Sequence, residues 1–360
     1  MMDEKKLIEI YNKASDFFYN SNINLGEKSK HWASFYNVQN FNEENLKNFR
    51  NSKSKLSAGL DNTSSNFSFK LYSEIINKVS ENYLLNNLPK KNIGNNDFLI
   101  PYKNIFLDSI KLIHIYWFWI IENKILKKRN INNICEIGGG FGSFSELFIK
   151  NYNTKIFLID LPEANLMSAY YLTKLFPEKN YYLFNNYIEK EFLSKSDFDS
   201  NDIIILPPNC KIDKNIKIDF FINTRSMMEM NFNTIKSYFD LIQKHSIEGS
   251  FFLNINRYEK NTVGHPIRIA EYPYDDCWNV IISEPSFNQK KIHFLLTERT
   301  FKINKKNIIE ELNKINTTKK KFYRSQKISN KILKNIFGIK TIKYIAKFLS
   351  KISDKLKSIE

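Results

Sequence analysis

A glycine-rich turn constrains the fold of this chain more than any other feature. The segment before it, Asn-Ile-Cys-Glu-Ile at 133–137, is mostly apolar and is expected to form a short buried strand, while a helical pattern follows to residue 149. Between them, four of the chain's ten glycines fall within five positions: Gly138, Gly139, Gly140 and Gly142. Because glycine adopts positive φ and leaves backbone N–H groups accessible, we predict a strand-to-helix turn against which a ligand lies.

The spacing of these glycines argues against a dinucleotide site. The pattern GxGxxG, begun at Gly138, would place its third glycine at position 143, where this chain has Ser143. A second apolar segment, residues 155–159, is followed by Asp160, which lies about 20 residues past the glycines. An acidic residue there can accept both ribose hydroxyls of a bound nucleoside. Two plainer interpretations stay open: a glycine turn without a ligand, and Asp160 as the cap of the next helix.

The charge of the chain is concentrated in its last sixty residues. The net charge is +16, but residues 301–360 hold 17 basic and 4 acidic residues, so +13 belongs to the tail and +3 to residues 1–300. Residues 1–300 therefore lack the large excess of basic residues that is typical of a nucleic-acid enzyme. The cysteines, at positions 135, 210 and 277, lack metal-ligand spacing, so no metal site is expected. The charged opening MMDEKK and the lack of a long apolar segment predict a cytoplasmic protein.

Apolar segments alternate with helical patterns through the middle of the chain. Further strands are expected at 202–206, 218–222 and 250–255, edge strands at 281–283 and 293–297, and helices at 164–176 and 234–245. This alternation predicts a parallel, doubly wound α/β sheet, with residues 177–201 as an insertion. Upstream, helices are expected at 7–18, 43–49, 67–85 and 105–126. We divide the chain into an N-terminal helical region (1–130), an α/β domain (131–302) and a basic helical tail (303–360).

The residues that follow the expected strands should meet around one crevice. In an open α/β sheet the ligand lies beyond the carboxyl ends of the strands, where the strand order reverses. This rule places Pro207 and Asn223 beside the glycines and Asp160 as candidates for binding the nucleoside. Pro207 is expected at the edge of the pocket for the base.

Four motifs together resemble one known family. They are EIGGGFG at 136–142, IDLPE at 159–163 followed by AYYL, INTRSMMEM at 222–230, and LNINRYE at 253–259. In this order they resemble the sugar O-methyltransferases of bacterial surface-polysaccharide gene clusters, a family of class I S-adenosylmethionine (SAM) methyltransferases. The resemblance covers about residues 130–300. It implies a Rossmann-like fold, SAM as the cofactor, and methyl transfer to a sugar hydroxyl of capsule, lipopolysaccharide or a precursor.

The resemblance also assigns residues to the site. It implies SAM binding by Glu136, Gly138, Gly140, Gly142 and Asp160, with Gly139 in the same turn. It places Ser226 and Glu229 on the face of the active site.

Methyl transfer to a sugar hydroxyl needs a base, because a hydroxyl is a very weak acid. The candidates are Glu229, after the fourth expected strand, and His265, in the loop after the fifth. Each has a plainer interpretation, Glu229 as the start of a helix and His265 as a surface histidine. Residues expected to bind the acceptor are Arg225, Ser226, Arg257, Tyr258 and Arg268. His114, in an aromatic segment before the glycine turn, is interpreted as packed in the core.

From residue 319 onward the tail is rich in lysine, and its apolar residues recur at three- and four-residue spacing. Such a basic amphipathic helix suits an anionic membrane surface or a partner protein, or packs on its own body. We expect a sugar, nucleotide-sugar or lipid-linked glycan as acceptor, the tail at the inner face of the membrane, and no nucleic acid. Two alternatives stay open: methylation of RNA or another small molecule, and an interaction module without catalysis.

Overall fold

The computed structural model describes residues 3–20, 41–54, 65–261, 264–301 and 307–315. The lysine-rich segment from residue 319 onward lies outside these residues, so the expectations for it stay predictions. Residues 1–308 form one compact unit and residues 309–360 a second. The boundaries expected at residues 130 and 302 stay predictions as well. None of the described helices is long and apolar enough to cross a membrane.

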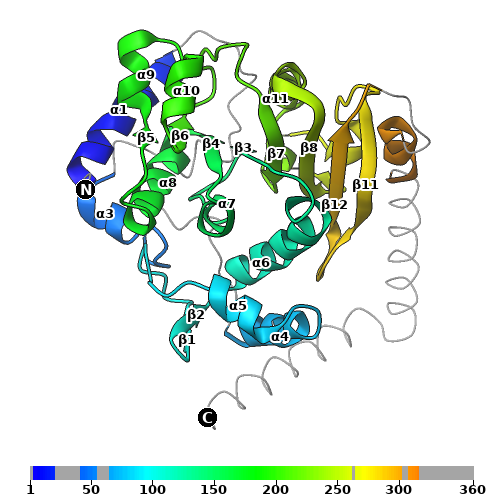
Figure 1. Ribbon diagram of the computed structural model, residues 1–360. Coiled ribbons are helices and arrows are strands. Elements are labelled where there is room, and N and C mark those ends of the chain that lie inside the picture. The colour runs from blue at the N-terminus through cyan, green and yellow to red at the C-terminus, as the bar shows by residue number, and fades with distance from the viewer. Residues whose placement is uncertain (1–2, 21–40, 55–64, 262–263, 302–306, 316–360) are drawn as a thin grey trace. The chain divides into compact units, whose positions relative to one another are not determined.

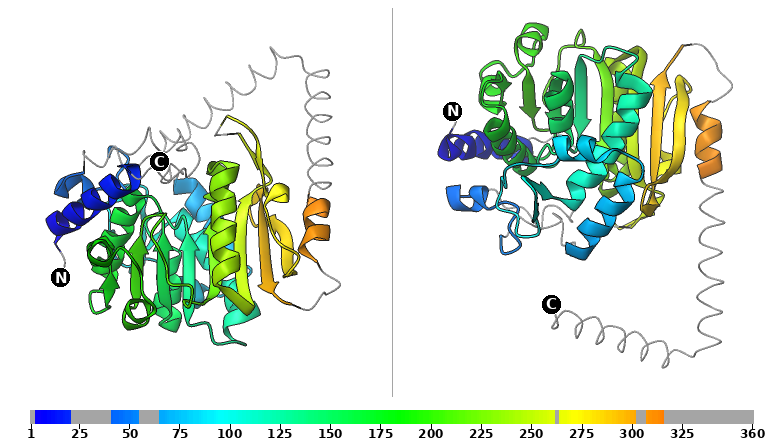
Figure 2. Two further views of the ribbon diagram at one scale, coloured as in Figure 1. Left: turned by 90° about the horizontal axis from the view of Figure 1, so that it is seen from above. Right: turned by 60° about the horizontal axis from the view of Figure 1, so that its bottom comes forward.

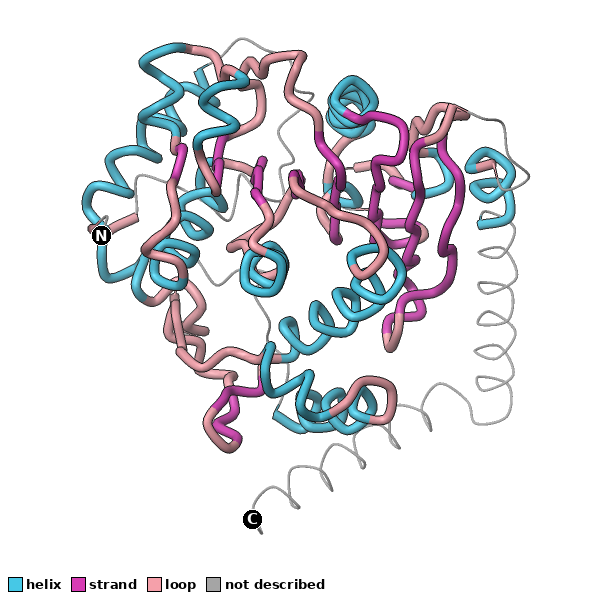
Figure 3. The backbone as a smooth tube through the Cα atoms, viewed as in Figure 1, coloured by secondary structure: helices cyan, strands magenta, loops and turns pink. Residues whose placement is uncertain are grey.

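An eight-stranded sheet forms the centre of the first unit (Figure 1 and Figure 3). Its order is β11-β12-β8-β7-β3-β4-β6-β5, and within it β12 runs antiparallel to both neighbours while the other pairs are parallel. The strands are β3 (Asn133–Ile137), β4 (Lys155–Ile159), β5 (Tyr181–Tyr182), β6 (Ile203–Leu206), β7 (Ile218–Thr224), β8 (Ser246–Arg257), β11 (Trp278–Ser286) and β12 (Gln289–Arg299). The predicted α/β class is confirmed, and each predicted strand is present.

The register of the central strands places the glycine turn. Strands β3 and β4 pair from Asn133↔Lys155 to Ile137↔Ile159, so they end side by side. The N–H of Gly138 then donates to the carbonyl of Ile159 at 2.8 Å. Since β4 lies on one side of β3 and β7 on the other, the strand order reverses at β3, which is where ligands bind in sheets of this kind.

Helices cover both faces of the sheet (Figure 2). On one face α7 (Ser145–Tyr152) packs through Phe148 against Phe220 of β7, with ring centroids 6.1 Å apart. On the other face α11 (Phe232–His245) packs through Phe239 against Phe252 of β8, at 5.7 Å. Helix α8 (Pro162–Leu175) starts directly after β4, with a proline in its first turn, where the missing N–H costs nothing.

Two of the predicted N-terminal helices were wrong in their extent. The segment 105–126 begins as a strand, β2 (Ile105–Leu107), which pairs with β1 (Ile100–Tyr102); the helix α6 (Ser109–Ile121) starts after it and ends in a π-helical turn, η2 (Glu122–Leu126). The cause is Asp108, whose carboxylate caps the helix by accepting from the N–H groups of Ile110 and Lys111. Similarly, 67–85 divides into α4 (Ser65–Ile76) and α5 (Glu81–Asn87), the second capped by Ser80.

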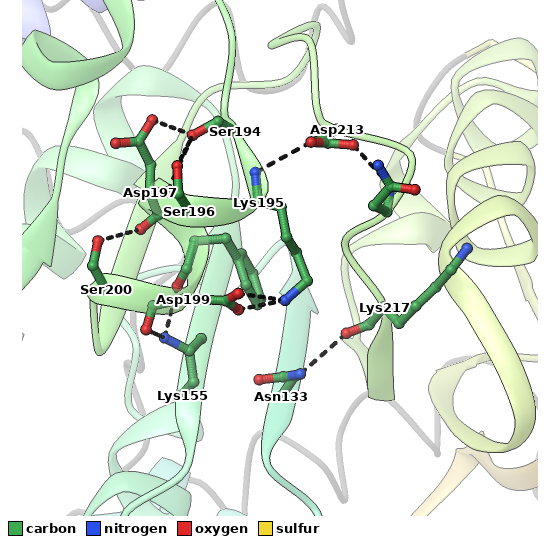
Figure 4. A network of polar contacts seen from close by, with 12 residues as sticks. Asn133, Lys155, Ser194, Lys195, Ser196, Asp197, Asp199, Ser200, Asp213 and Lys217 are labelled. Carbon is green, nitrogen blue, oxygen red and sulfur yellow. Dashed lines mark hydrogen bonds and ion pairs between the residues drawn. The ribbon is translucent and has the colours of Figure 1, made fainter.

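The segment interpreted as an insertion, 177–201, belongs to the sheet. It contributes the edge strand β5, which pairs with β6, followed by α9 (Phe184–Lys190) and α10 (Lys195–Ser200). Figure 4 shows how α10 is attached to the sheet: Lys155, at the start of β4, donates to the carbonyls of Phe198 at 2.6 Å and Asp199 at 3.0 Å. A lysine at the last carbonyls of a helix is a favourable cap.

The N-terminal helix α1 (Glu4–Asn20) packs against α8 at the β5 side of the sheet, away from β11 (Figure 2). Glu4 forms an ion pair with Lys174 at 2.9 Å, and the hydroxyl of Tyr19 donates to Glu163 at 2.7 Å. A short helix, α3 (Glu43–Lys47), follows. These contacts place the N-terminal helices directly beside the helix that follows Asp160.

Candidate functional site

The glycine turn presents open backbone at one position. Gly138, Gly140 and Gly142 have φ of 72°, 59° and 81°, a range in which other residues are strained. A Cβ built on Gly138 would lie 1.8 Å from Oγ of Ser226, so the turn is closely covered there. A Cβ on Gly140 would meet nothing within 4 Å among the described residues. A ligand can therefore approach the backbone at Gly140.

Asp160 lies at the same place. Its carboxylate accepts from the N–H of Gly140 and from the N–H of Leu161, each at 2.8 Å and each on a different oxygen. Because a carboxylate oxygen can accept two hydrogen bonds, each oxygen keeps capacity for one further donor, such as a ribose hydroxyl. Burial, with a smaller contribution from the negative charges of Glu163 and Glu229, raises the pKa of Asp160 to about 7, although the two backbone donors act to lower it. A bound polyol or positive charge would favour the ionised form.

This pKa predicts a pH-dependent stability. An unfolded aspartate has a pKa of about 3.9, so between about pH 4 and pH 7 the folded state holds a proton that the unfolded state has lost. The free energy of unfolding should therefore fall as the pH rises across that window. Asp160→Asn should reduce this fall by on the order of 1 kcal/mol. Urea unfolding at pH 5 and pH 8 measures it, with the surface variant Asp240→Asn as control; an equal fall in Asp160→Asn and wild type would contradict the prediction.

Glu136 lies beneath the turn rather than in the open part of the crevice. Its side chain is 1% exposed and accepts from the hydroxyl of Ser145, at the start of α7. A Cβ on Gly139 would come within 3.0 Å of the Glu136 carboxyl carbon. Burial raises the pKa of Glu136 to about 7. The structure therefore gives Glu136 a supporting position under the turn, and its predicted contact with the cofactor stays a prediction.

Asn223 is fully occupied by contacts within the protein. Its amide donates to the carbonyl of Ile137 at 2.8 Å and to Oγ of Ser226 at 3.1 Å. Its oxygen accepts from the N–H of Met227 at 3.2 Å and from the side chain of Asn256 at 2.8 Å. An asparagine has two donors and an oxygen with two lone pairs, and these four contacts use all of them. In this arrangement Asn223 holds Ser226 over the glycine turn, and its predicted role in binding the cofactor stays a prediction.

Two buried asparagines of β8, which the sequence did not mark as site residues, extend this network. Asn256 donates to Asn254 at 2.7 Å, and Asn254 donates to the hydroxyl of Tyr274 at 3.1 Å. Both lie on β8 and are 0% exposed. The signal in the sequence was the pair of asparagines two residues apart in an otherwise apolar strand, because alternate residues share one face of the sheet.

The two candidate bases differ in their surroundings. Glu229 ends the short helix η3 (Met227–Glu229), and its carboxylate forms an ion pair with Lys260, at the end of β9 (Glu259–Lys260). This pair attaches the hairpin of β9 and β10 (Ile267–Arg268) to the turn after β7. His265, in the loop of that hairpin, is exposed. Glu229 thus has an ion-pairing role that the sequence did not indicate, and the role of either residue as a base stays a prediction.

Four of the five predicted acceptor residues divide into two groups. Arg225 is exposed at the end of β7, with a left-handed φ of 62° that a hydrogen bond from its N–H to the carbonyl of Ile255, 2.7 Å long, helps to hold. Ser226 lies beside it over Gly138. The side chains of two others form contacts within the protein. Arg268 pairs with Glu259 at 2.6 Å and with Glu271 at 2.8 Å, and the hydroxyl of Tyr258 is hydrogen-bonded to His293 at 3.0 Å.

Pro207 is buried directly after β6, the strand next to β4. Its neighbour Asn209 turns the chain with a φ of 75°. Pro207 therefore lies at the carboxyl end of the sheet, as expected. Its contact with the nucleobase of a bound nucleoside stays a prediction.

A buried cluster of charges, which was not predicted from the sequence, packs beneath the glycine turn. Lys111 of α6 donates to the carbonyl of Ser143 at 2.7 Å and forms an ion pair with Glu146 of α7. The carboxylate of Glu146 also accepts from the hydroxyl of Tyr171 at 2.6 Å. A second pair, Arg50 with Asp108 at 2.7 Å, lies next to it. A lysine inside an apolar helix was the available signal, since buried charges are found in pairs.

The imidazole of His114 lies between the turn and α6. It contacts the rings of Phe144 and Trp117, with centroids 5.1 Å and 5.6 Å away, so it is packed as expected. Its Nδ1 is nevertheless buried without a hydrogen-bond partner in the described part of the chain. Burial lowers the pKa of His114 to about 3, and the positive charges of Lys111 and Arg225 contribute. The ring is therefore neutral at pH 7.

Comparisons with known proteins give similarity only to solved structures. Neither a scan against family models nor a search of curated proteins finds a match. Among the solved structures, mitomycin 7-O-methyltransferase MmcR is 13% identical, with a TM-score of 0.31 over 53% of this chain and 57% of that one. A SAM-dependent methyltransferase from Clostridium acetobutylicum is 13% identical, with a TM-score of 0.35 over 51% and 89%. Magnesium protoporphyrin IX methyltransferase from Synechocystis, with bound SAM, is 8% identical, with a TM-score of 0.37 over 65% and 97%. At TM-scores this low, these similarities assign no function to the chain.

Proposed function

We propose that this chain is a SAM-dependent O-methyltransferase whose acceptor is a sugar hydroxyl of a surface glycan or of its precursor. The observation that carries the proposal is the open backbone at Gly140 beside the carboxylate of Asp160. A glycine turn after one strand and an acid after the next form a nucleoside site at the point where strand order reverses. The four motifs of the sequence support SAM and a sugar over other nucleosides and acceptors.

The residues present fit SAM. When bound, SAM supplies a methyl group on a positively charged sulfur. Asp160 would accept the ribose hydroxyls with the hydrogen-bonding capacity that Gly140 and Leu161 leave on its oxygens. Its ionised form, and the nearby charge of Glu229, would favour a cationic ligand. Pro207, after β6, would border the nucleobase of SAM.

The residues beside the acceptor would mainly hold its hydroxyl group in place next to the glycine turn. Arg225 and Ser226 lie at the end of β7, next to the glycine turn, and Asn223 holds Ser226 there. Fixing a hydroxyl in line with the group it attacks supplies a large part of the rate in such displacements. The hydroxyl proton must leave during the reaction. Glu229, paired with Lys260, and His265, in the loop between β9 and β10, are the candidates to accept it.

The test of the cofactor is calorimetric titration with S-adenosylhomocysteine, beside NAD. Wild type should bind S-adenosylhomocysteine and not NAD. Asp160→Ala should weaken binding by at least 10- to 100-fold, since each lost hydrogen bond to a charged group is worth about 1.5–3 kcal/mol. Asp240→Ala, on the exposed side of α11, is the control and should bind as wild type does. A folded wild-type protein that does not bind S-adenosylhomocysteine would refute the proposal and favour an interaction module.

The acceptor class needs a separate experiment. Purified protein, SAM labelled in its methyl group, and parallel samples of nucleotide sugars, lipid-linked sugars and RNA should give label in a sugar fraction. Label in RNA alone would replace the sugar by RNA as acceptor. The RNA alternative rests on the basic tail, which lies outside the described residues, and nothing in residues 65–261 favours it.

A further inference from the structure

One turn of helix α6 lies against the glycine turn and the end of β11. His114 contacts Phe144, which follows β3 and the glycine turn. Trp117 also contacts Phe144, with ring centroids 6.2 Å apart, and its Nε1 donates to Ser286 at 3.2 Å. Ser286 ends β11, which runs parallel to β8 because β12 is antiparallel to both. The carboxyl ends of β3 and β11 therefore meet the same part of α6.

Arg257 is the last residue of β8 and lies on the face that α6 and α7 cover. Along a strand, alternate residues share a face, so Arg257 shares one with Phe251. Phe251 packs against Phe220, and Phe220 against Phe148 of α7. The register pairs Ile255 of β8 with Thr224 of β7, so Arg257 lies just beyond Arg225 along the edge.

Within the described residues, the guanidinium of Arg257 has no ion-pair partner, and its Nε is buried without a hydrogen bond. The carboxylates of the adjoining hairpin have cations of their own: Glu229 pairs with Lys260, and Glu259 with Arg268 at 2.6 Å. A partly buried charge without a partner is costly, and such a group in a folded protein calls for an explanation. Nδ1 of His114, on α6, is a second buried polar atom without a hydrogen-bond partner in the described part of the chain.

We infer that Arg257 binds an anionic group of the acceptor, a phosphate or a carboxylate, at the end of β8. The inference rests on the proposed function and narrows its substrate to a phosphorylated, nucleotide-linked or acidic sugar. A guanidinium has a planar set of donors that matches these oxyanions with two parallel hydrogen bonds. Arg225, whose positive charge reaches His114, adds to the positive potential at this edge. The anion would hold the sugar beside Ser226 and the glycine turn.

Calorimetric titration of the full chain with three probes tests this inference, with and without S-adenosylhomocysteine. The probes are pyrophosphate, glucuronate and glucose. Wild type should bind at least one of the two anions more tightly than glucose, and the preferred anion tells a phosphate from a carboxylate. Arg257→Gln should weaken anion binding by about 10- to 100-fold, the value of one charged hydrogen-bonding partner.

The matched control is Arg129→Gln, an arginine outside the predicted site whose guanidinium is already held by Glu298 at 2.7 Å. It should bind anions as wild type does. Arg257→Lys, which keeps the charge but not the planar donors, should recover part of the affinity. Arg257→Gln should unfold in urea no more easily than wild type, because it removes a charge without a protein partner.

Two results would overturn the inference: no anion binding by wild type, or equal anion binding by wild type and Arg257→Gln. They differ from failure of the proposed function, which is absence of S-adenosylhomocysteine binding in the same samples. Anion binding that depends on Arg257 without binding of S-adenosylhomocysteine would retain the anion site and refute the methyltransferase.

Discussion

Replacing Lys111 by methionine is expected to lower the free energy of unfolding by about 3–5 kcal/mol, because it breaks a buried ion pair by removing one partner. The side chain of Lys111 is 1% exposed and that of Glu146 is 6% exposed, so water cannot replace the lost ammonium. Among the described residues, the carboxylate of Glu146 would then keep the hydroxyl of Tyr171 as its one side-chain donor. The carbonyl of Ser143 would lose its side-chain donor as well.

Urea unfolding followed by circular dichroism measures this effect. Lys124→Met is the control, since Lys124 lies exposed in the helical turn that follows the same helix. The double variant Lys111→Met/Glu146→Gln should recover a large part of the loss, because glutamine is neutral and still accepts from Tyr171. A loss below 1 kcal/mol in Lys111→Met, or no recovery in the double variant, would show that the pair is not held as described.

The charge cluster connects the N-terminal region to the candidate site. Asp108 both caps α6 and pairs with Arg50, so one carboxylate fixes the start of the helix and the loop before α4. One turn later on α6, Lys111 reaches Ser143, the residue after the last glycine of the turn. The guanidinium of Arg50 lies 4.7 Å from the ring of Phe141, inside the turn itself. The shape of the turn therefore depends on residues far upstream of it in sequence.

The sheet was largely predictable because its signal is local. Strand β4 was predicted to the residue, since a parallel strand buried on both faces is a continuous apolar run between polar ends. Strand β5 was missed because two tyrosines are too short a run to give a pattern; their pairing with β6 makes them a strand. The helix expected from residue 105 began later because Asp108 competes with the helix for backbone N–H groups and so fits a cap better than an interior position.

The site was less predictable because its decisive contacts join distant residues. The glycines and Asp160 were found from their spacing, and the hydrogen bond between Gly140 and Asp160 agrees with that interpretation. The pairing of Glu229 with Lys260 spans 31 residues, and no local pattern marks it. Asn223 was predicted to bind the ligand because it lies at a strand end, but its side-chain amide is hydrogen-bonded to Ile137 and Asn256, from the strands on either side. Only the order of the strands in the sheet shows that these two residues are within its reach.

The second large effect is expected for Gly138→Ala, which should abolish measurable binding of S-adenosylhomocysteine and destabilise the fold. The φ of 72° is left-handed, which costs a residue with a Cβ about 1–2 kcal/mol. The new Cβ would also lie 1.8 Å from Oγ and 2.3 Å from Cβ of Ser226, so the turn or the end of β7 must move. Overpacking of this kind adds about 1–3 kcal/mol. Either movement displaces the backbone that would hold the ligand.

Two further variants separate the strain from the clash. Gly140→Ala has a left-handed φ of 59° but no atom within 4 Å of its new Cβ, so it should lose only the strain energy, while its methyl group occupies the open side of the turn. Gly138→Ala combined with Ser226→Gly removes both clashing atoms and should recover the stability lost to overpacking. If Gly138→Ala alone unfolds as wild type does and binds S-adenosylhomocysteine with unchanged affinity, then Ser226 does not cover the turn as described. The glycine at 138 would then be needed neither for its conformation nor for the close approach of β7, and the turn would lose its place as the centre of the site.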